Sequence, residues 1–217
     1  MDFRTIVGIG GFPNATLFEY VLGLARGRRV LVDRTASPQY GEGLVPPVTL
    51  LPGELTAFSF YPWPPENLRE LALGSDVILV CGGNTANMLA VWRVHGFDRI
   101  LREAWEAGVV LAGWSAGMIC WFEAGVTDSF GPQLDGMRDG LGFLSGSGCP
   151  HYDGEELRRP VYTRLVADGF PAGIALDDGV AARFAGTELV EVVTGVPGAR
   201  GYRVEPGGET PLETRPL

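Results

Sequence analysis

A short apolar run that leads straight into Gly113–Gly117, a Gly-Trp-Ser-Ala-Gly sequence, is the feature that most constrains this chain. The run, Val109–Ala112, has the length and composition of a buried strand. The G-x-S-x-G pattern is typical of a sharp strand-to-helix turn that exposes a serine, and its glycines avoid Cβ clashes. The alternative is a tight turn with an incidental serine. We expect Met118–Phe122 to continue as a buried helix.

Strand and helix patterns alternate before this turn. The pattern predicts a parallel sheet covered by helices on both faces. Thr16 and Glu19 form a possible capping box for the first helix, and Asp98 can cap a later one. The expected strands are Thr5–Ile9, Val30–Val32, Asp76–Val80 and Val109–Ala112.

The end of the chain has a different pattern, with short strands separated by tight turns, so we expect the late strands to be antiparallel. They are Gly173–Leu176, Ala181–Phe184, Leu189–Val193 and Tyr202–Val204. With 217 residues, 46% of them hydrophobic, the chain suits a single α/β domain, 1–217. The Pro- and Gly-rich segment 37–65 is left unassigned.

Charge and cysteine content restrict the class of protein. A net charge of −9 disfavours nucleic-acid binding. No apolar stretch is long enough to span a membrane, and the N-terminus lacks the basic region of a signal peptide. Cys81, Cys120 and Cys149 are odd in number and have no metal-ligand spacing, so we expect no disulfide framework and a cytoplasmic location. The oligomeric state stays open, a homodimer included.

A serine nucleophile usually needs a base, most often histidine, and the chain has two. His95 stands just before Gly96, where a helix-end histidine beside a glycine C-cap is the simpler interpretation. His151 follows a Gly- and Ser-rich stretch and lies in a loop, where catalytic side chains are often displayed. If Ser115 is catalytic, His151 is the better base.

Three acids could orient His151, namely Asp178 after an apolar strand, Asp128 soon after the nucleophile turn, and Asp153 two residues beyond the histidine. Spacing alone does not choose among them. The loop at 81–85 also follows a buried strand and could lend a backbone N–H to an oxyanion hole, together with that of Ala116.

Four short sequences occur in an order that resembles peptidase family S51, which contains peptidase E and cyanophycinase. They are Gly-Gly-Asn-Thr at 82–85, Gly-Trp-Ser-Ala-Gly at 113–117, Pro-His at 150–151 and Asp-Asp-Gly at 177–179. The resemblance runs from about Val77 to Val204. The stretches 87–96 and 150–155 look like a bacterial branch of peptidase E-like proteins.

The resemblance implies a three-layer α/β/α fold of the class I glutamine amidotransferase type, with a mostly parallel central sheet. It implies Ser115 as nucleophile, His151 as base, and the N–H groups of Gly83 and Ala116 as oxyanion donors. It allows either acid, Asp178 or Asp128, and we prefer Asp178 because the ends of parallel strands converge on one edge. No metal or cofactor is implied.

The resemblance also bears on the choice of substrate. Peptidase E holds an N-terminal aspartate with a basic residue after the histidine, and here Arg158 and Arg159 are the candidates. We therefore expect a serine peptidase of the peptidase E type that cleaves short peptides. The alternatives are a cyanophycinase-like or other small amide or ester hydrolase, and a catalytically silent amidotransferase-like binding module.

Overall fold

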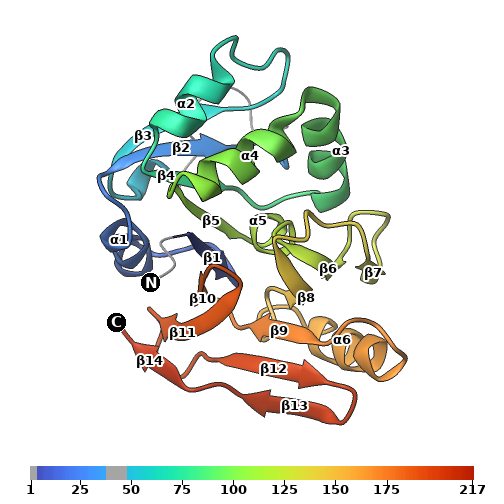
Figure 1. The fold of residues 1–217 in the computed structure, drawn as a ribbon. Helices are drawn as coiled ribbons and strands as arrows, with labels where there is room; N and C mark the ends of the chain where they lie inside the picture. Colours follow the sequence, from blue (N-terminus) through green and yellow to red (C-terminus); the bar gives the residue numbers. More distant parts are fainter. Residues whose placement is uncertain (1–3, 38–47) are drawn as a thin grey trace.

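The computed structural model describes residues 4–37 and 48–217, and the strands of this part form two β-sheets (Figure 1). The larger sheet has eight strands in the order β14-β11-β10-β1-β5-β4-β2-β3. Its members are β1 (Thr5–Ile9), β2 (Arg29–Asp33), β3 (Glu54–Phe58), β4 (Val77–Val80), β5 (Val110–Trp114), β10 (Val180–Ala185), β11 (Glu188–Thr194) and β14 (Thr214–Pro216).

Five neighbouring strands of this sheet, β1, β5, β4, β2 and β3, run parallel. All residues of β1, β4 and β5 are buried, which fits their nearly continuous apolar sequences. The carboxyl ends of parallel strands lie at the same edge of a sheet. The turns after β1, β4 and β5 therefore meet at that edge.

The second sheet has six strands in the order β13-β12-β9-β8-β6-β7. Its members are β6 (Phe122–Thr127), β7 (Asp135–Met137), β8 (Leu144–Cys149), β9 (Gly173–Leu176), β12 (Gly201–Glu205) and β13 (Gly208–Pro211). The expected late antiparallel pairing is confirmed, since β12 pairs antiparallel with β9 and β10 with both β1 and β11. The sequence did not reveal that the strands at 173–176 and 180–185 belong to different sheets.

Four connections in the described part of the chain cross between the sheets. Residues 115–121 lead from β5 to β6, residues 177–179 from β9 to β10, residues 195–200 from β11 to β12, and residues 212–213 from β13 to β14. The candidate site residues Ser115 and Asp178 stand in the first two of these segments. His151 stands in the loop between β8 and α6.

Helices cover both faces of the larger sheet, which confirms the predicted α/β class. Buried residues of α1 pack with one face, and those of α2, α3 and α4 pack with the other. The helices are α1 (Ala15–Gly23), α2 (Leu68–Gly74), α3 (Thr85–His95), α4 (Phe97–Glu106), α5 (Ala116–Ile119) and α6 (Arg158–Ala167), with a 3₁₀ turn at Val48–Leu50. In Figure 1 α6 lies beside the second sheet, and residues of both share a core cluster.

Three helix predictions were wrong in detail. The first helix is capped by Asn14, whose side chain accepts the Leu17 N–H at 2.9 Å, and not by a box at Thr16 and Glu19. Gly96 precedes α4, and Asp98 lies in its first turn. The helix expected over 118–122 ends at Ile119 because the chain enters the second sheet at Phe122.

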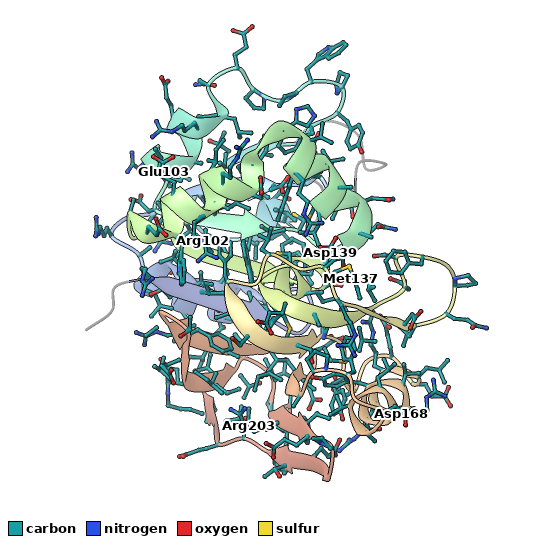
Figure 2. All side chains as sticks on the ribbon, turned by 45° about the vertical axis from the view of Figure 1, so that its right-hand side comes forward. Arg102, Glu103, Met137, Asp139, Asp168 and Arg203 are labelled. Atoms are coloured by element: carbon teal, nitrogen blue, oxygen red, sulfur yellow. The ribbon has the colours of Figure 1, made fainter. Side chains whose placement is uncertain are left out.

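Long side chains connect α4 to its surroundings. Figure 2 labels Arg102 and Glu103, consecutive residues of this helix whose side chains extend in different directions. The Arg102 guanidinium lies 3.7 Å from the ring centroid of Phe143, just before β8, and Glu103 forms an ion pair with Arg69 of α2. These contacts connect α4 to the neighbouring helix and to the segment that precedes β8.

Part of segment 37–65, which the sequence left unassigned, forms β3 at the edge of the larger sheet, while residues 38–47 lie outside the described part. None of the helices in the described ranges has the length and apolar character needed to cross a bilayer.

Candidate active site

Ser115 occupies the predicted strand-to-helix turn, between β5 and the single-turn helix α5. Its backbone has φ 55° and ψ −116°, a conformation that side chains other than glycine rarely adopt. A Cβ at Gly113 would lie 2.4 Å from the Gly117 oxygen, and one at Gly117 would lie 2.2 Å from the Val80 oxygen. Both glycines of the motif are therefore required by close backbone packing, and the strained serine is presented at the sheet edge.

The loop that the sequence proposed for the oxyanion hole lies against the serine. A Cβ at Gly82 would stand 3.1 Å from the Ser115 Cβ. Gly83 has φ 137° and is exposed. Within residues 4–37 and 48–217, neither the Gly83 N–H nor the Ala116 N–H has a hydrogen-bond partner. Both donors are thus available to a bound group. The helix after Ser115 is only one turn long, so its dipole adds little.

Residues after β2 support this loop, and sequence analysis did not assign them a role. The Ser37 hydroxyl donates to the Gly82 oxygen at 2.6 Å, and the Asn84 N–H donates to the Ala36 oxygen at 2.9 Å. The signal was present in the sequence, since these residues also follow a buried strand that runs parallel to β4.

Asp33, the last residue of β2, is a fully buried carboxylate behind this support. It accepts hydrogen bonds from Trp92 Nε1 at 2.8 Å and from the backbone N–H and hydroxyl of Thr35. Burial raises the pKa of Asp33 to about 6, against the opposing effect of these hydrogen bonds. The carboxylate ties the segment after β2 to α3.

His151 and Asp178 are brought together by the fold. The His151 Nδ1 and Asp178 Oδ1 atoms are 2.7 Å apart. Because an ionised carboxylate only accepts hydrogen bonds, Nδ1 carries the proton and Nε2 keeps its lone pair. The His151 side chain is 20% exposed and that of Asp178 51%. This arrangement can orient the imidazole and stabilise its protonated form.

The end of β1 is where the two halves of the site meet. The Ser115 N–H donates to the Ile9 oxygen at 3.3 Å, and the His151 N–H donates to the Gly10 oxygen at 3.2 Å. These carbonyls belong to consecutive residues, so the serine and the histidine are fixed to the same short stretch of backbone. His151 also has a positive φ of 53°, which is uncommon for its residue type.

Glycines around Asp178 make room for its carboxylate, and sequence analysis assigned them no part in the site. A Cβ at Gly11 would lie 2.2 Å from Asp178 Oδ1, and one at Gly154 would lie 2.5 Å from Oδ2. A Cβ at Gly10 would lie 2.2 Å from the Asp177 oxygen. The acid therefore occupies a slot that larger residues would close.

Asp128, the other acid that the sequence allowed, is placed differently. It is exposed just after β6, and within the described ranges its side chain forms no hydrogen bond. Its neighbour Ser129 instead bonds to Thr127 and to the start of α3. Of the two acids, the structure brings only Asp178 to His151.

The two arginines predicted to bind substrate have partners within the protein. Arg158 is buried and donates to Glu155 at 2.7 Å and to the Val126 oxygen at 2.7 Å. Arg159 forms an ion pair with Glu209. The structure therefore argues against Arg158 as a substrate ligand, because binding would break a buried network. Arg159 would first have to leave Glu209.

The cysteines do not offer a rival nucleophile. All three are free and buried. Burial raises the pKa of Cys149 to about 12 and raises those of Cys81 and Cys120 as well, which keeps the thiols protonated. In the part of the chain that the structure describes, no group of three or more His, Cys, Asp or Glu residues could hold a metal ion.

Comparison with known proteins identifies the class. The profile of peptidase family S51 matches residues 54–192, a range that includes Ser115, His151 and Asp178. The chain belongs to this family, and it is a serine-type peptidase. It is 43% identical over 208 residues to the uncharacterized peptidase YgaJ of Bacillus subtilis (strain 168), an alignment that covers 91% of this chain and 90% of that protein.

Solved structures share the fold. A protein from Listeria monocytogenes EGD-e named for peptidase E superposes with a TM-score of 0.63 at 20% identity, covering 86% of this chain and 96% of that one. A peptidase from an acI-B1 Actinobacterium superposes with a TM-score of 0.67 at 17% identity, covering 97% and 94%. At these identities the likeness concerns the fold alone.

Proposed function

We propose that this peptidase hydrolyses short peptides through Ser115, His151 and Asp178. The hydroxyl of Ser115 attacks the carbonyl carbon of the scissile amide, while Nε2 of His151 takes the hydroxyl proton. The same nitrogen then gives that proton to the leaving amine. A water molecule, activated by His151 in turn, releases the acyl group from Ser115.

The observation that carries this proposal is the hydrogen bond of 2.7 Å between His151 and Asp178, combined with the hydrogen bonds of the Ser115 and His151 N–H groups to the consecutive carbonyls of Ile9 and Gly10, at the end of β1 and just after it. Asp178 stabilises the imidazolium that forms during attack. The N–H groups of Gly83 and Ala116, which have no partner among the described residues, would hold the oxyanion, each contributing about 3 kcal/mol to transition-state stabilisation.

The substrate class rests on the family. We propose short peptides, including those with an N-terminal aspartate, as the substrates. The partners found for Arg158 and Arg159 weaken the case that either one recognises the aspartate. The aspartyl preference is therefore tested directly, with a panel of dipeptides.

The test is hydrolysis of a panel of Asp-Xaa, Ala-Xaa, Glu-Xaa and β-Asp-Arg dipeptides by the wild type and by Ser115→Ala. We expect hydrolysis of Asp-Xaa by the wild type and at least a ~10⁴-fold loss in a variant that still folds. Full activity in Ser115→Ala would exclude the serine as nucleophile. Turnover of β-Asp-Arg alone would favour a cyanophycinase-like enzyme. Absence of any turnover would favour a binding module.

A further inference from the structure

The turn that carries His151 is joined to the segment that carries Asp178 by three hydrogen bonds. The Tyr152 N–H donates to the Leu176 oxygen at 3.1 Å, and His151 Nδ1 meets the Asp178 carboxylate. The third bond is donated by the Asp178 backbone N–H to Oδ1 of Asp153 at 2.8 Å. Asp153 therefore holds the backbone of Asp178, and His151 binds its carboxylate.

We infer that Asp153 is a positioning residue, which holds the backbone of Asp178 so that the Asp178 carboxylate stays aligned with His151. This inference rests on the proposed function. Asp153 acts on the acid and not on the imidazole, because its Oδ1 atom is committed to the Asp178 N–H. The role differs from that of a catalytic acid, for which Asp153 was also a candidate.

The exposure of Asp178 is the reason why such a support matters. Its side chain is 51% exposed, so water competes for the carboxylate oxygens that His151 needs. Segment 177–179 also crosses from one sheet to the other, and ladder hydrogen bonds do not fix its middle residue. Among the described residues, Asp153 supplies the only side-chain hydrogen bond to the Asp178 backbone.

The residues next to Asp178 and around its carboxylate are also held in place. The Asp177 N–H donates to the Arg200 oxygen at 3.2 Å, and its Oδ2 accepts the Arg200 N–H at 3.0 Å. The slot between Gly11 and Gly154 limits the movement of the Asp178 carboxylate. The peptide group between Asp177 and Asp178 is held at its oxygen by the Val180 N–H, at 3.2 Å, and at its N–H by Asp153. Without Asp153 the N–H side of this group has no side-chain partner among the described residues, and the group can tilt about the bond that remains.

Three variants test this role. Asp153→Ala removes the acceptor, Asp153→Asn removes the charge but keeps an acceptor oxygen, and Glu156→Ala is the control. Glu156 is exposed in the same segment and forms no hydrogen bond within the described ranges. Each variant is checked for folding by circular dichroism. If Asp153→Ala does not fold, Asp153→Glu replaces it, because an added methylene displaces the acceptor, and the same loss is expected.

The kinetic readout is kcat and KM for the best dipeptide of the panel. We expect Asp153→Ala to lower kcat about 10–100-fold, as loss of one charge-assisted hydrogen bond does, with KM within about twofold of the wild type. Asp153→Asn should stay within about threefold in kcat, and Glu156→Ala should match the wild type. Equal losses in Asp153→Ala and Asp153→Asn would overturn the inference, because charge would then be the cause.

A second readout does not depend on turnover. The chain has two histidines, so the downfield proton resonance of the His151 Nδ1–H group can be assigned by comparison with His151→Gln. We expect this resonance in the wild type, Asp153→Asn and Glu156→Ala, and its broadening or loss in Asp153→Ala. An unchanged resonance in Asp153→Ala would overturn the inference. If the wild type hydrolyses no peptide, the proposed function fails while this measurement still tests Asp153.

Discussion

The nucleophile and the acid–base pair of this site are held in different ways. Ser115 is fixed by backbone packing. Gly113 lies against the Gly117 peptide group, and Gly117 lies against that of Val80 in the neighbouring parallel strand. His151 and Asp178 are instead fixed by side-chain hydrogen bonds at a junction between two sheets. Substitutions around Ser115 should therefore lower the free energy of unfolding. Substitutions around His151 and Asp178 should lower kcat before they affect stability.

Among the variants that separate these two regions, the largest effect should come from the acid. Asp178→Asn keeps the size of the side chain but replaces the acceptor that selects the Nδ1–H tautomer of His151. We expect a fall in kcat of roughly 10³-fold or more, with little change in the free energy of unfolding. Steady-state kinetics and urea denaturation measure the two effects.

Asp128→Asn is the matched control, since Asp128 is the acid that the structure leaves away from His151. It should retain activity within about twofold of the wild type. If Asp128→Asn lost as much activity as Asp178→Asn, the assignment of the acid would be reversed.

Two glycine substitutions sharpen the contrast between the regions. Gly117→Ala would place a Cβ 2.2 Å from the Val80 backbone oxygen, and we expect it to destabilise the protein by about 3 kcal/mol. Gly154→Ala would place a Cβ 2.5 Å from the exposed carboxylate of Asp178. The added methyl group contacts the end of a side chain and not backbone, and it displaces that carboxylate from His151. We therefore expect a change in stability below about 1 kcal/mol but a fall in kcat of about tenfold or more.

Denaturation curves and kcat for both variants decide the matter. A Gly117→Ala protein of full stability, or a Gly154→Ala protein with full activity, would remove the distinction that we draw between the two regions.

A smaller effect concerns the buried carboxylate behind the oxyanion loop. The pKa of Asp33 is about 6 in the folded protein and about 3.9 in an unfolded chain. Between these values the native state binds a proton that the unfolded state has lost, so stability falls as pH rises. Ionisation of Asp33 should thus cost about 2–3 kcal/mol between pH 4 and pH 7.

The measurement is urea denaturation of the wild type and of Asp33→Asn across this range. As pH rises, the free energy of unfolding of the wild type should fall relative to that of Asp33→Asn, because Asn does not titrate. A difference that does not vary with pH would show that the buried carboxylate is not the cause.

The sequence by itself determined the elements whose signals are local. β1 and β9 have the predicted bounds, and the other strands predicted for the larger sheet lie within a few residues of them. The serine turn, the position of His95 at the end of α3, and the glycine that ends this helix were also predicted. These features depend on apolar runs, on turn chemistry and on residue counts, all of which a short window contains.

Only the tertiary structure decided which distant residues meet. It separated β9 from β10 into two sheets, paired His151 with Asp178 across 27 positions, and placed Asp153 against the Asp178 backbone across 25. It also gave Arg158 and Arg159 partners that the spacing did not show. The physical reason is that strand pairing and sheet crossing are set by the packing of the whole core, whereas a sequence pattern reports on its own neighbourhood.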